Sequence, residues 1–165
     1  MKKFTTFTLA VILTILFCSS CETENTRHFK SEAEAKAFFL KLDEEQKRAI
    51  KEQDSLWFAN NFVDDYVNCT PSGIINNKKD EIKTLLSLPL KNYETLPQYQ
   101  FFEYSGNLAV LSVINRISND TGDVVIYNRR TKVFKLIDEE WKCVSAQGTL
   151  VPAEFIEKMN EEKQQ

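Results

Sequence analysis

Two aspartates are the candidates for acid–base chemistry. Asp54 precedes an apolar segment, and Asp65 stands directly before Tyr66. A carboxylate beside a hydroxyl donor can act as a general base in proton transfer. Both residues also have a structural interpretation, because Asp54 is suited to cap a helix and Asp65, next to Asp64, is suited to form a turn. The sequence leaves the catalytic and the structural interpretation open.

Gln147, Tyr66 and Trp57 are candidates for lining a ligand pocket. Strict alternation along 141–149 places Gln147 on one face with Cys143, Ser145 and Thr149, and a polar set is unusual for a pure core. Gln147 also has a structural alternative, a hydrogen bond to a neighbouring helix. Trp57 has the alternative of an ordinary core aromatic.

Arg129 is the fourth pocket candidate. It shares one face of a predicted strand with Tyr127 and Thr131, whereas Arg130 and Lys132 share the other face. An inward Arg129 could hold an anionic ligand through its planar guanidinium, and an outward Arg129 would meet solvent or a second copy of the chain. Periodicity alone does not say which face points inward.

Cys69 and Cys143 are the cysteines beyond the N-terminal segment. They could form a disulfide in an oxidising compartment, or they could remain two separate buried thiols. Neither belongs to a CxxC pair, and the one histidine is His28, so we expect no metal site and no cofactor. The sequence also lacks a Walker loop and the GxSxG and HExxH motifs.

Hydrophobic periodicity predicts helices first and a run of strands later. A capping-box pattern at Ser31 opens a helical stripe that continues to Phe62, with a break near Asp54. Turn residues separate the strands that follow, at the spacing of antiparallel hairpins. The predicted elements are helices over 31–62, strands 66–69 and 74–75, a helix over 78–88 that stops at Pro89, strands 99–104, 108–117, 124–136 and 141–149, and a helix over 152–162.

The N-terminus has the pattern of an export signal. Two lysines precede an apolar stretch over 4–17, and small residues lead to Cys21. We expect residues 1–20 to be a signal peptide and Cys21 to be lipidated, with 21–30 as a polar tether to a membrane of the bacterial envelope. The alternative is simple secretion with an unmodified Cys21.

Composition and charge exclude several classes of protein. With 42% hydrophobic residues, four glycines and four prolines, the chain is neither collagen-like nor low-complexity. Its net charge is −3 at pH 7, and it becomes −5 without residues 1–20, which hold Lys2 and Lys3. Because no dense basic run is present, we expect no nucleic-acid binding.

Several segments resemble the nuclear transport factor 2-like (NTF2-like) superfamily, in its SnoaL-like or DUF4440 type. They include FVDDYV with PSG, the helix KKDEIKTLL, SGNLAVL, and the closing WKCVSAQGT. The resemblance is strongest over 49–151 and implies one domain over 31–165. It implies an α+β, cone-shaped fold in which a curved, mostly antiparallel sheet packs on N-terminal helices. It also implies frequent homodimers and a pocket that members use differently.

Three hypotheses follow for function. The first is an envelope-anchored lipoprotein whose domain binds a small, partly apolar ligand or a protein partner without catalysis. The second is an isomerase, cyclase or hydratase with Asp65 or Asp54 as general base, which requires a carboxylate deep in the cavity. The third is a structural dimer module, which predicts little vacant volume between the sheet and the helices.

Overall fold

A computed structural model describes residues 29–88, 92–121 and 124–162 of the protein. The predicted signal peptide, the lipidation site at Cys21 and most of the tether lie outside these residues, as does Pro89. Within the described ranges, no helix combines the length and the apolar character needed to cross a membrane.

The two predicted helical segments form as separate helices. Helix α2 spans Glu32–Glu52, and the Ser31 side chain caps it by accepting a hydrogen bond from the Glu34 amide at 3.2 Å. The chain turns at Gln53, whose φ of 57° lies in the left-handed region. Helix α3 then spans Ser55–Asn61, and Asp54 accepts from the Trp57 amide at 3.0 Å. The predicted break and both caps are therefore confirmed.

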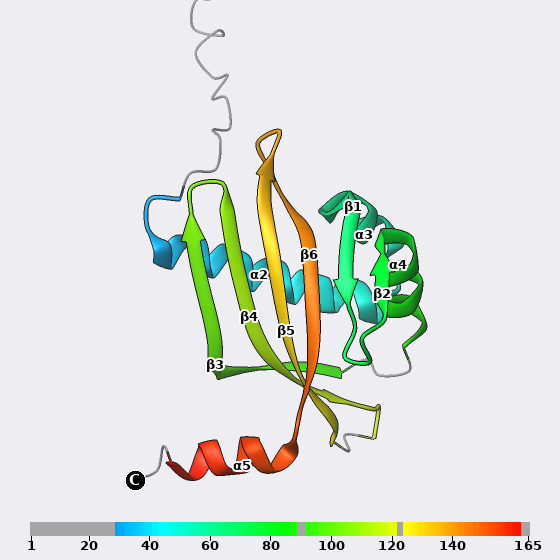
Figure 1. Ribbon diagram of the computed structural model, residues 1–165, viewed down its shortest axis with the longest axis vertical. Coiled ribbons are helices and arrows are strands. Elements are labelled where there is room, and N and C mark those ends of the chain that lie inside the picture. The colour runs from blue at the N-terminus through cyan, green and yellow to red at the C-terminus, as the bar shows by residue number, and fades with distance from the viewer. Residues whose placement is uncertain (1–28, 89–91, 122–123, 163–165) are drawn as a thin grey trace, which may run out of the picture.

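The remaining elements form one sheet with helices around it (Figure 1). The sheet has six strands in the order β2-β1-β6-β5-β4-β3, and β1 runs parallel to β6 while the other pairs are antiparallel. The elements are β1 Phe62–Cys69, β2 Ile75–Asn77, α4 Lys78–Ser87, β3 Asn92–Ser105, β4 Leu108–Ser118, β5 Val124–Ile137, β6 Glu140–Val151 and α5 Ala153–Glu162.

Two strands begin several residues earlier than the sequence predicts. Strand β3 starts at Asn92, because an edge strand tolerates Pro97 where its pairing with β4 shifts register between Leu96 and Phe101. Strand β1 starts at Phe62, which pairs with Cys143 of β6. Both extensions depend on pairing with distant strands, which local periodicity does not report.

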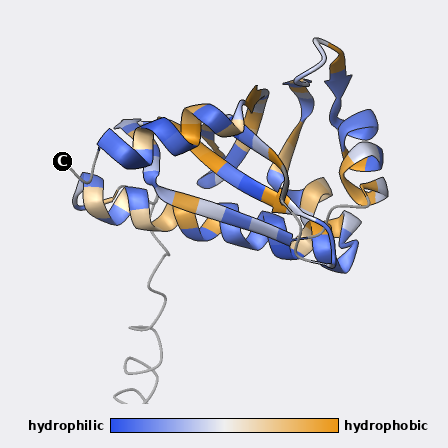
Figure 2. Ribbon diagram, turned by 90° about the horizontal axis from the view of Figure 1, so that it is seen from below, coloured by the Kyte–Doolittle hydropathy of each residue, from blue (hydrophilic) through white to orange (hydrophobic). Residues whose placement is uncertain are grey.

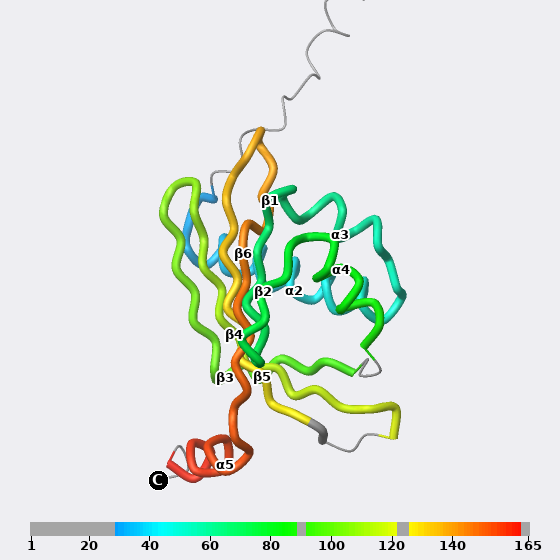
Figure 3. Tube along the Cα trace, turned by 45° about the vertical axis from the view of Figure 1, so that its right-hand side comes forward, coloured from blue at the N-terminus to red at the C-terminus, as the bar shows by residue number. Residues whose placement is uncertain are grey.

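The helices lie on both faces of the curved sheet. Helices α2, α3 and α4 cover one face (Figure 3). On the opposite face, Ile156 of α5 packs against Tyr99 and Ile114. Hydrophobic and hydrophilic residues alternate along α2 and along the long strands (Figure 2), so each element has an apolar side to bury.

An aromatic core fills one end of the space between α2 and the sheet. Phe39 is its centre, with ring centroids 4.9 Å from Phe134, 5.0 Å from Trp141 and 5.7 Å from Phe102. Phe29 closes this end with its ring 5.8 Å from Phe39. At the other end of α2 the aromatic residues give way to charged and amide side chains, and a cavity takes the place of the core.

Candidate ligand-binding site

The cavity has a volume of about 380 Å³ and lies between α2, α4, the 70–73 turn and the concave face of the sheet. This is within the usual range for small-molecule sites. The hypothesis of a purely structural module predicts little vacant volume here, so the cavity weighs against it. Its apolar lining consists of Ile50, Pro71, Ile74, Leu85, Leu88, Ile117 and Ile126.

A buried carboxylate organises the α2 side of the cavity. Asp43 is 1% exposed, and it accepts hydrogen bonds from Lys132 of β5 and from Lys47, one helical turn along α2, at 2.9 Å. Lys132 also donates to the amide oxygen of Gln46. Burial by itself would raise the pKa of Asp43, but the two ammonium groups outweigh it and lower that pKa. Asp43 therefore stays ionised at neutral pH.

A second buried carboxylate organises the opposite side. Glu81 of α4 accepts from the guanidinium of Arg130 at 2.6 Å through Oε1. Its Oε2 accepts from the amide nitrogens of Asn68 at 2.7 Å and Asn76 at 3.0 Å. Burial alone would lower the pKa of Arg130, but Tyr66 and Glu81 raise it, so the guanidinium keeps its charge. Strand β5 thus supplies a cation to each carboxylate.

The structure settles the open question about β5. Arg130 and Lys132 line the cavity, together with Asn128 on the same face. Arg129 lies between Asn128 and Arg130 in sequence and therefore on the other face, where it pairs with Thr149 of β6. The arginine that can hold an anion is Arg130, and Arg129 lies outside the cavity.

Gln147 also lies on the outer face, contrary to the prediction from alternation. The β5–β6 register shifts where Phe134 pairs with Cys143 and Val133 pairs with Ser145, which leaves Val144 as an extra residue. This bulge reverses the alternation beyond it. Gly148 consequently faces inward and is buried, while Gln147 is exposed.

Gly148 faces inward at a close contact with the 70–73 turn. A Cβ atom at Gly148 would lie 3.0 Å from Cδ of Pro71. The absence of a side chain therefore lets the turn pack directly on the sheet beside the cavity.

Tyr66 and Trp57 belong to the core around the cavity and do not line it. Tyr66 is 1% exposed and stacks on Phe62 with centroids 4.1 Å apart. Among the described residues its hydroxyl has no hydrogen-bond partner, and burial raises its pKa well above the ordinary value of 10. Trp57 packs edge-on against Phe58, with centroids 5.1 Å apart.

The two catalytic candidates lie away from the cavity. Asp54 caps α3 and forms an ion pair with Arg48 at 3.4 Å, and Asp65 is exposed on β1. The neighbouring Asp64 is also exposed and pairs with Lys78 at 3.0 Å. The structure thus brings none of the three to a buried position where a general base could meet a ligand in the cavity.

Replacing Asp54 by alanine should therefore act on stability. We expect a loss of about 1 kcal/mol in the free energy of unfolding, because the Trp57 amide loses its capping acceptor. The matched Asp65→Ala change removes an exposed carboxylate and should alter stability by less than about 0.5 kcal/mol. Urea unfolding of both variants measures the difference, and equal effects would refute the capping role.

Both cysteines are free thiols in the structure. Cys143 pairs with Phe62 and Cys69 pairs with Gln147, so the two cysteines occupy different positions along the β1–β6 ladder. Burial raises the pKa of the Cys143 thiol to about 12, so it is protonated at neutral pH and is no nucleophile. Among the described residues, no cluster of three His, Cys, Asp or Glu could hold a metal ion.

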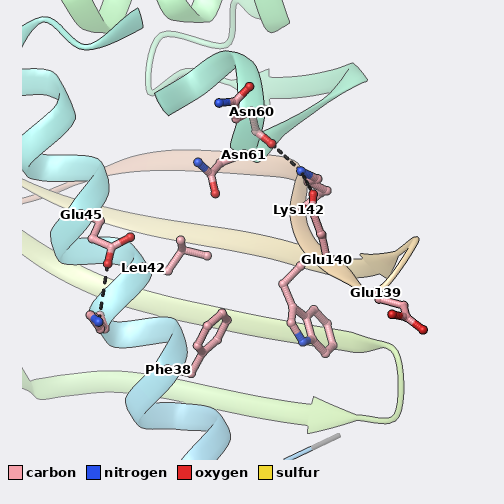
Figure 4. Close-up of a pocket in the computed structure, with 10 residues that line it drawn as sticks. Phe38, Leu42, Glu45, Asn60, Asn61, Glu139, Glu140 and Lys142 are labelled. Carbon is pink, nitrogen blue, oxygen red and sulfur yellow. Dashed lines mark hydrogen bonds and ion pairs between the residues drawn. The ribbon is translucent and has the colours of Figure 1, made fainter. Parts of the chain in front are cut away.

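A larger hollow lies near the other end of α2 (Figure 4). It has a volume of about 840 Å³ and is lined by Phe38 and Leu42 of α2, Asn61 of α3 and the β5–β6 hairpin. Lys142 is occupied here, because it donates to the backbone oxygen of Asn60 at 2.6 Å and to Glu140. The charged side chains of this hollow are exposed or partly exposed, so it lacks the buried charges that distinguish the cavity.

Sequence reasoning missed Asp43, Glu81, Lys132 and the inward role of Arg130. The sequence does contain one signal for the burial of Asp43. Asp43 and Lys47 lie four residues apart on the same helical face as Phe39 and Ile50, which are buried. Opposite charges within an apolar stripe indicate a buried pair.

No protein-family model matches the chain. No curated protein matches it either. Solved structures do match. An NTF2-like protein from Cytophaga hutchinsonii superposes with a TM-score of 0.60 at 21% identity, over 70% of this chain and 98% of that one.

Two further solved structures extend the likeness. A protein of unknown function with a cystatin-like fold from Nostoc punctiforme superposes with a TM-score of 0.61 at 11% identity, over 74% of this chain and 95% of that one. A candidate ketosteroid isomerase from Parabacteroides distasonis superposes with a TM-score of 0.53 at 19% identity, over 66% of this chain and 83% of that one. Helices α2 to α4 on the concave face of a curved six-stranded sheet match this architecture. The chain therefore has the NTF2-like fold.

Proposed function

We propose that this protein is an envelope lipoprotein whose domain binds a small, partly apolar ligand in the cavity and does not transform it. The observation that carries the proposal is a vacant cavity of about 380 Å³ with five charged side chains packed around it. Burying charges is costly, and a well-packed apolar core is often at least as stable as buried ion pairs. A charged cavity wall therefore points to recognition of a ligand.

The pKa and the hydrogen bonds of the buried carboxylates support ligand binding over acid–base catalysis. A general base works best when its pKa is near the working pH. The lowered pKa of Asp43 makes it a weak base at neutral pH, and both of its oxygens already accept from lysines. Both oxygens of Glu81 are likewise occupied.

A cavity-blocking variant tests the proposal. Ile126→Trp places a large side chain in the cavity lining, whereas the matched Ile75→Trp change lies on β2 at a side chain that is 71% exposed. We expect small apolar acids, amides or alcohols to raise the unfolding midpoint of the full chain and of Ile75→Trp, but not of Ile126→Trp. Equal midpoint shifts in the two variants would place binding outside the cavity and refute the proposal.

The lipid anchor gives a separate prediction. In bacterial cells the full chain should fractionate with membranes, and Cys21→Ser should release it, because two or three acyl chains are needed for stable anchoring. Mass spectrometry of the mature N-terminus measures the acyl groups directly. A Cys69→Ser variant serves as the control and should stay with the membrane. An unmodified Cys21 would contradict this part of the proposal.

The outer sheet face supports a homodimer. Phe101, Val67 and Leu108 are 52%, 44% and 43% exposed, and their strand positions place them on the face away from α2. Exposed apolar side chains on one face of a sheet commonly mark an interface. Sedimentation of the full chain should give a dimer and that of Phe101→Asp a monomer; a wild-type monomer would refute the dimer.

A further inference from the structure

We infer that the ligand of this cavity is a small monocarboxylate with a compact apolar body, whose carboxylate binds between Arg130 and Lys132. The inference rests on the proposed binding function and specifies its ligand class. It depends on the balance of hydrogen-bond donors and acceptors in the cavity, on charge and on the position of the apolar lining.

The acidic groups of the cavity are already engaged. One oxygen of Asp43 accepts from Lys132 and the other from Lys47. One oxygen of Glu81 accepts from Arg130 and the other from two asparagine amides. A cationic ligand would have to displace one of these bonds.

The basic groups retain unused donors. A lysine has three N–H donors and an arginine has five. Lys47 uses all three, on Asp43, Glu44 and Thr95. Lys132 uses two, on Asp43 and Gln46, and Arg130 donates to Glu81 through one of its three nitrogens. The spare donors at the cavity wall are therefore those of Arg130 and Lys132.

These two residues are placed to act together. They lie two residues apart on the inward face of β5, and each is held on one side by a buried carboxylate. Side chains at that spacing project in the same direction. A group between them meets two cations whose positions are fixed before it binds, and a planar guanidinium matches a planar carboxylate.

The charge of the cavity fits a monoanion. Asp43 and Glu81 oppose Lys47, Arg130 and Lys132, which leaves one positive charge among the lining residues that the structure describes. Glu44 offsets Lys47 only from the solvent side, where its side chain is 62% exposed and water weakens the pairing. One surplus charge suits a carboxylate better than a dianionic phosphate.

The rest of the cavity defines the body of the ligand. Leu85, Ile117 and Ile126 border the same space, so the remainder of the molecule meets aliphatic side chains. The orphaned acceptor among the lining residues is neutral. It is the buried Oδ1 of Asn68, which has no hydrogen-bond partner and suits a ligand hydroxyl or N–H. A volume of about 380 Å³ admits a ring or a short chain.

Calorimetric titration of the full chain with four probes of similar size tests this inference. The probes are benzoate, the neutral benzamide, the cation benzylamine and the dianion phenyl phosphate. We expect benzoate to bind at least about tenfold more tightly than each of the others, because charge-assisted hydrogen bonds contribute more than neutral ones.

Three variants locate the effect. Arg130→Gln should weaken benzoate binding at least about tenfold and leave benzamide binding within about twofold. The double variant Glu81→Gln with Arg130→Gln removes both partners of the pair, so it keeps the test valid if the single variant fails to fold. Arg129→Gln changes the neighbouring arginine on the outer face and should bind benzoate like the unmodified chain.

The outcomes separate this inference from the function on which it rests. Equal affinity for benzoate and benzamide, or tighter binding of phenyl phosphate, overturns the monocarboxylate and leaves binding in the cavity standing. An equal loss of benzoate affinity in Arg129→Gln and Arg130→Gln overturns the assignment of the binding site to the inward face of β5. If no probe binds a chain that unfolds cooperatively, the inference is overturned, and the Ile126→Trp comparison then decides the proposed function separately.

Discussion

Replacing Asp43 by alanine should lower the free energy of unfolding by about 3–5 kcal/mol, because the change leaves two buried ammonium groups without their shared carboxylate. Lys132 and Lys47 both pair with Asp43, and all three side chains are less than one tenth exposed. The change therefore leaves Lys132 without an ionic partner among the described residues and leaves Lys47 with only the exposed Glu44. Urea unfolding of the full chain measures the loss.

Glu44 provides the matched control on the same helix. Its carboxylate also pairs with Lys47, at 2.7 Å, but it is mostly exposed. Glu44→Ala should cost less than about 1 kcal/mol, as exposed ion pairs do. Similar losses for Asp43→Ala and Glu44→Ala would contradict the conclusion that the buried carboxylate organises the cavity.

The pKa of Asp43 adds a pH dependence with a definite sign. Its pKa is lowered in the folded state from the ordinary value of 3.8, so its pairing stabilises the fold at pH values above 3.8. That contribution is lost as the pH falls from 3.8 through the lowered folded value. The free energy of unfolding should therefore fall less steeply with decreasing pH for Asp43→Asn than for the unmodified chain over that acidic range. Parallel plots of the unfolding free energy against pH would contradict the lowered pKa of Asp43.

The second large effect concerns the pair on the other side of the cavity. Glu81→Leu alone should cost about 3–5 kcal/mol, because it leaves Arg130 buried without its carboxylate. The double variant Glu81→Leu with Arg130→Met replaces both charges by apolar groups, and it should recover most of that loss. The Glu81–Arg130 distance of 2.6 Å makes the two residues a directly coupled pair.

Binding should not recover with stability. The double variant lacks the guanidinium, so it should bind benzoate at least about tenfold more weakly than the unmodified chain. Stable but non-binding protein is the expected result, measured by urea unfolding and by titration of the same sample. A double variant that binds benzoate normally would show that the pair is structural.

The sequence was a reliable guide to local structure. Ser31 and Asp54 cap their helices as expected, because a cap depends on contacts within three residues. The expected α+β cone also appears, with helices on the concave face of a mostly antiparallel sheet. These features follow from periodicity, turn residues and the resemblance over 49–151.

The site was harder to predict because it depends on pairing between distant strands. One extra residue at Val144 turns Gln147 outward, and no property of Val144 itself announces a bulge. The direction of Arg130 is fixed by the face of β5 that α2 and α4 cover, which a single strand does not encode. Glu81 is buried because it meets Arg130, 49 residues later in the chain.

A crystal structure of the full chain with 4-bromobenzoate would test anion binding in the cavity most directly, because the anomalous signal of bromine locates the ligand without ambiguity. We predict bromine beside the apolar lining near Ile117 and Ile126, and the carboxylate within hydrogen-bond distance of Arg130 and Lys132. Bromine in the hollow beside Phe38 and Leu42, or a carboxylate turned away from Arg130, would contradict anion binding in the cavity.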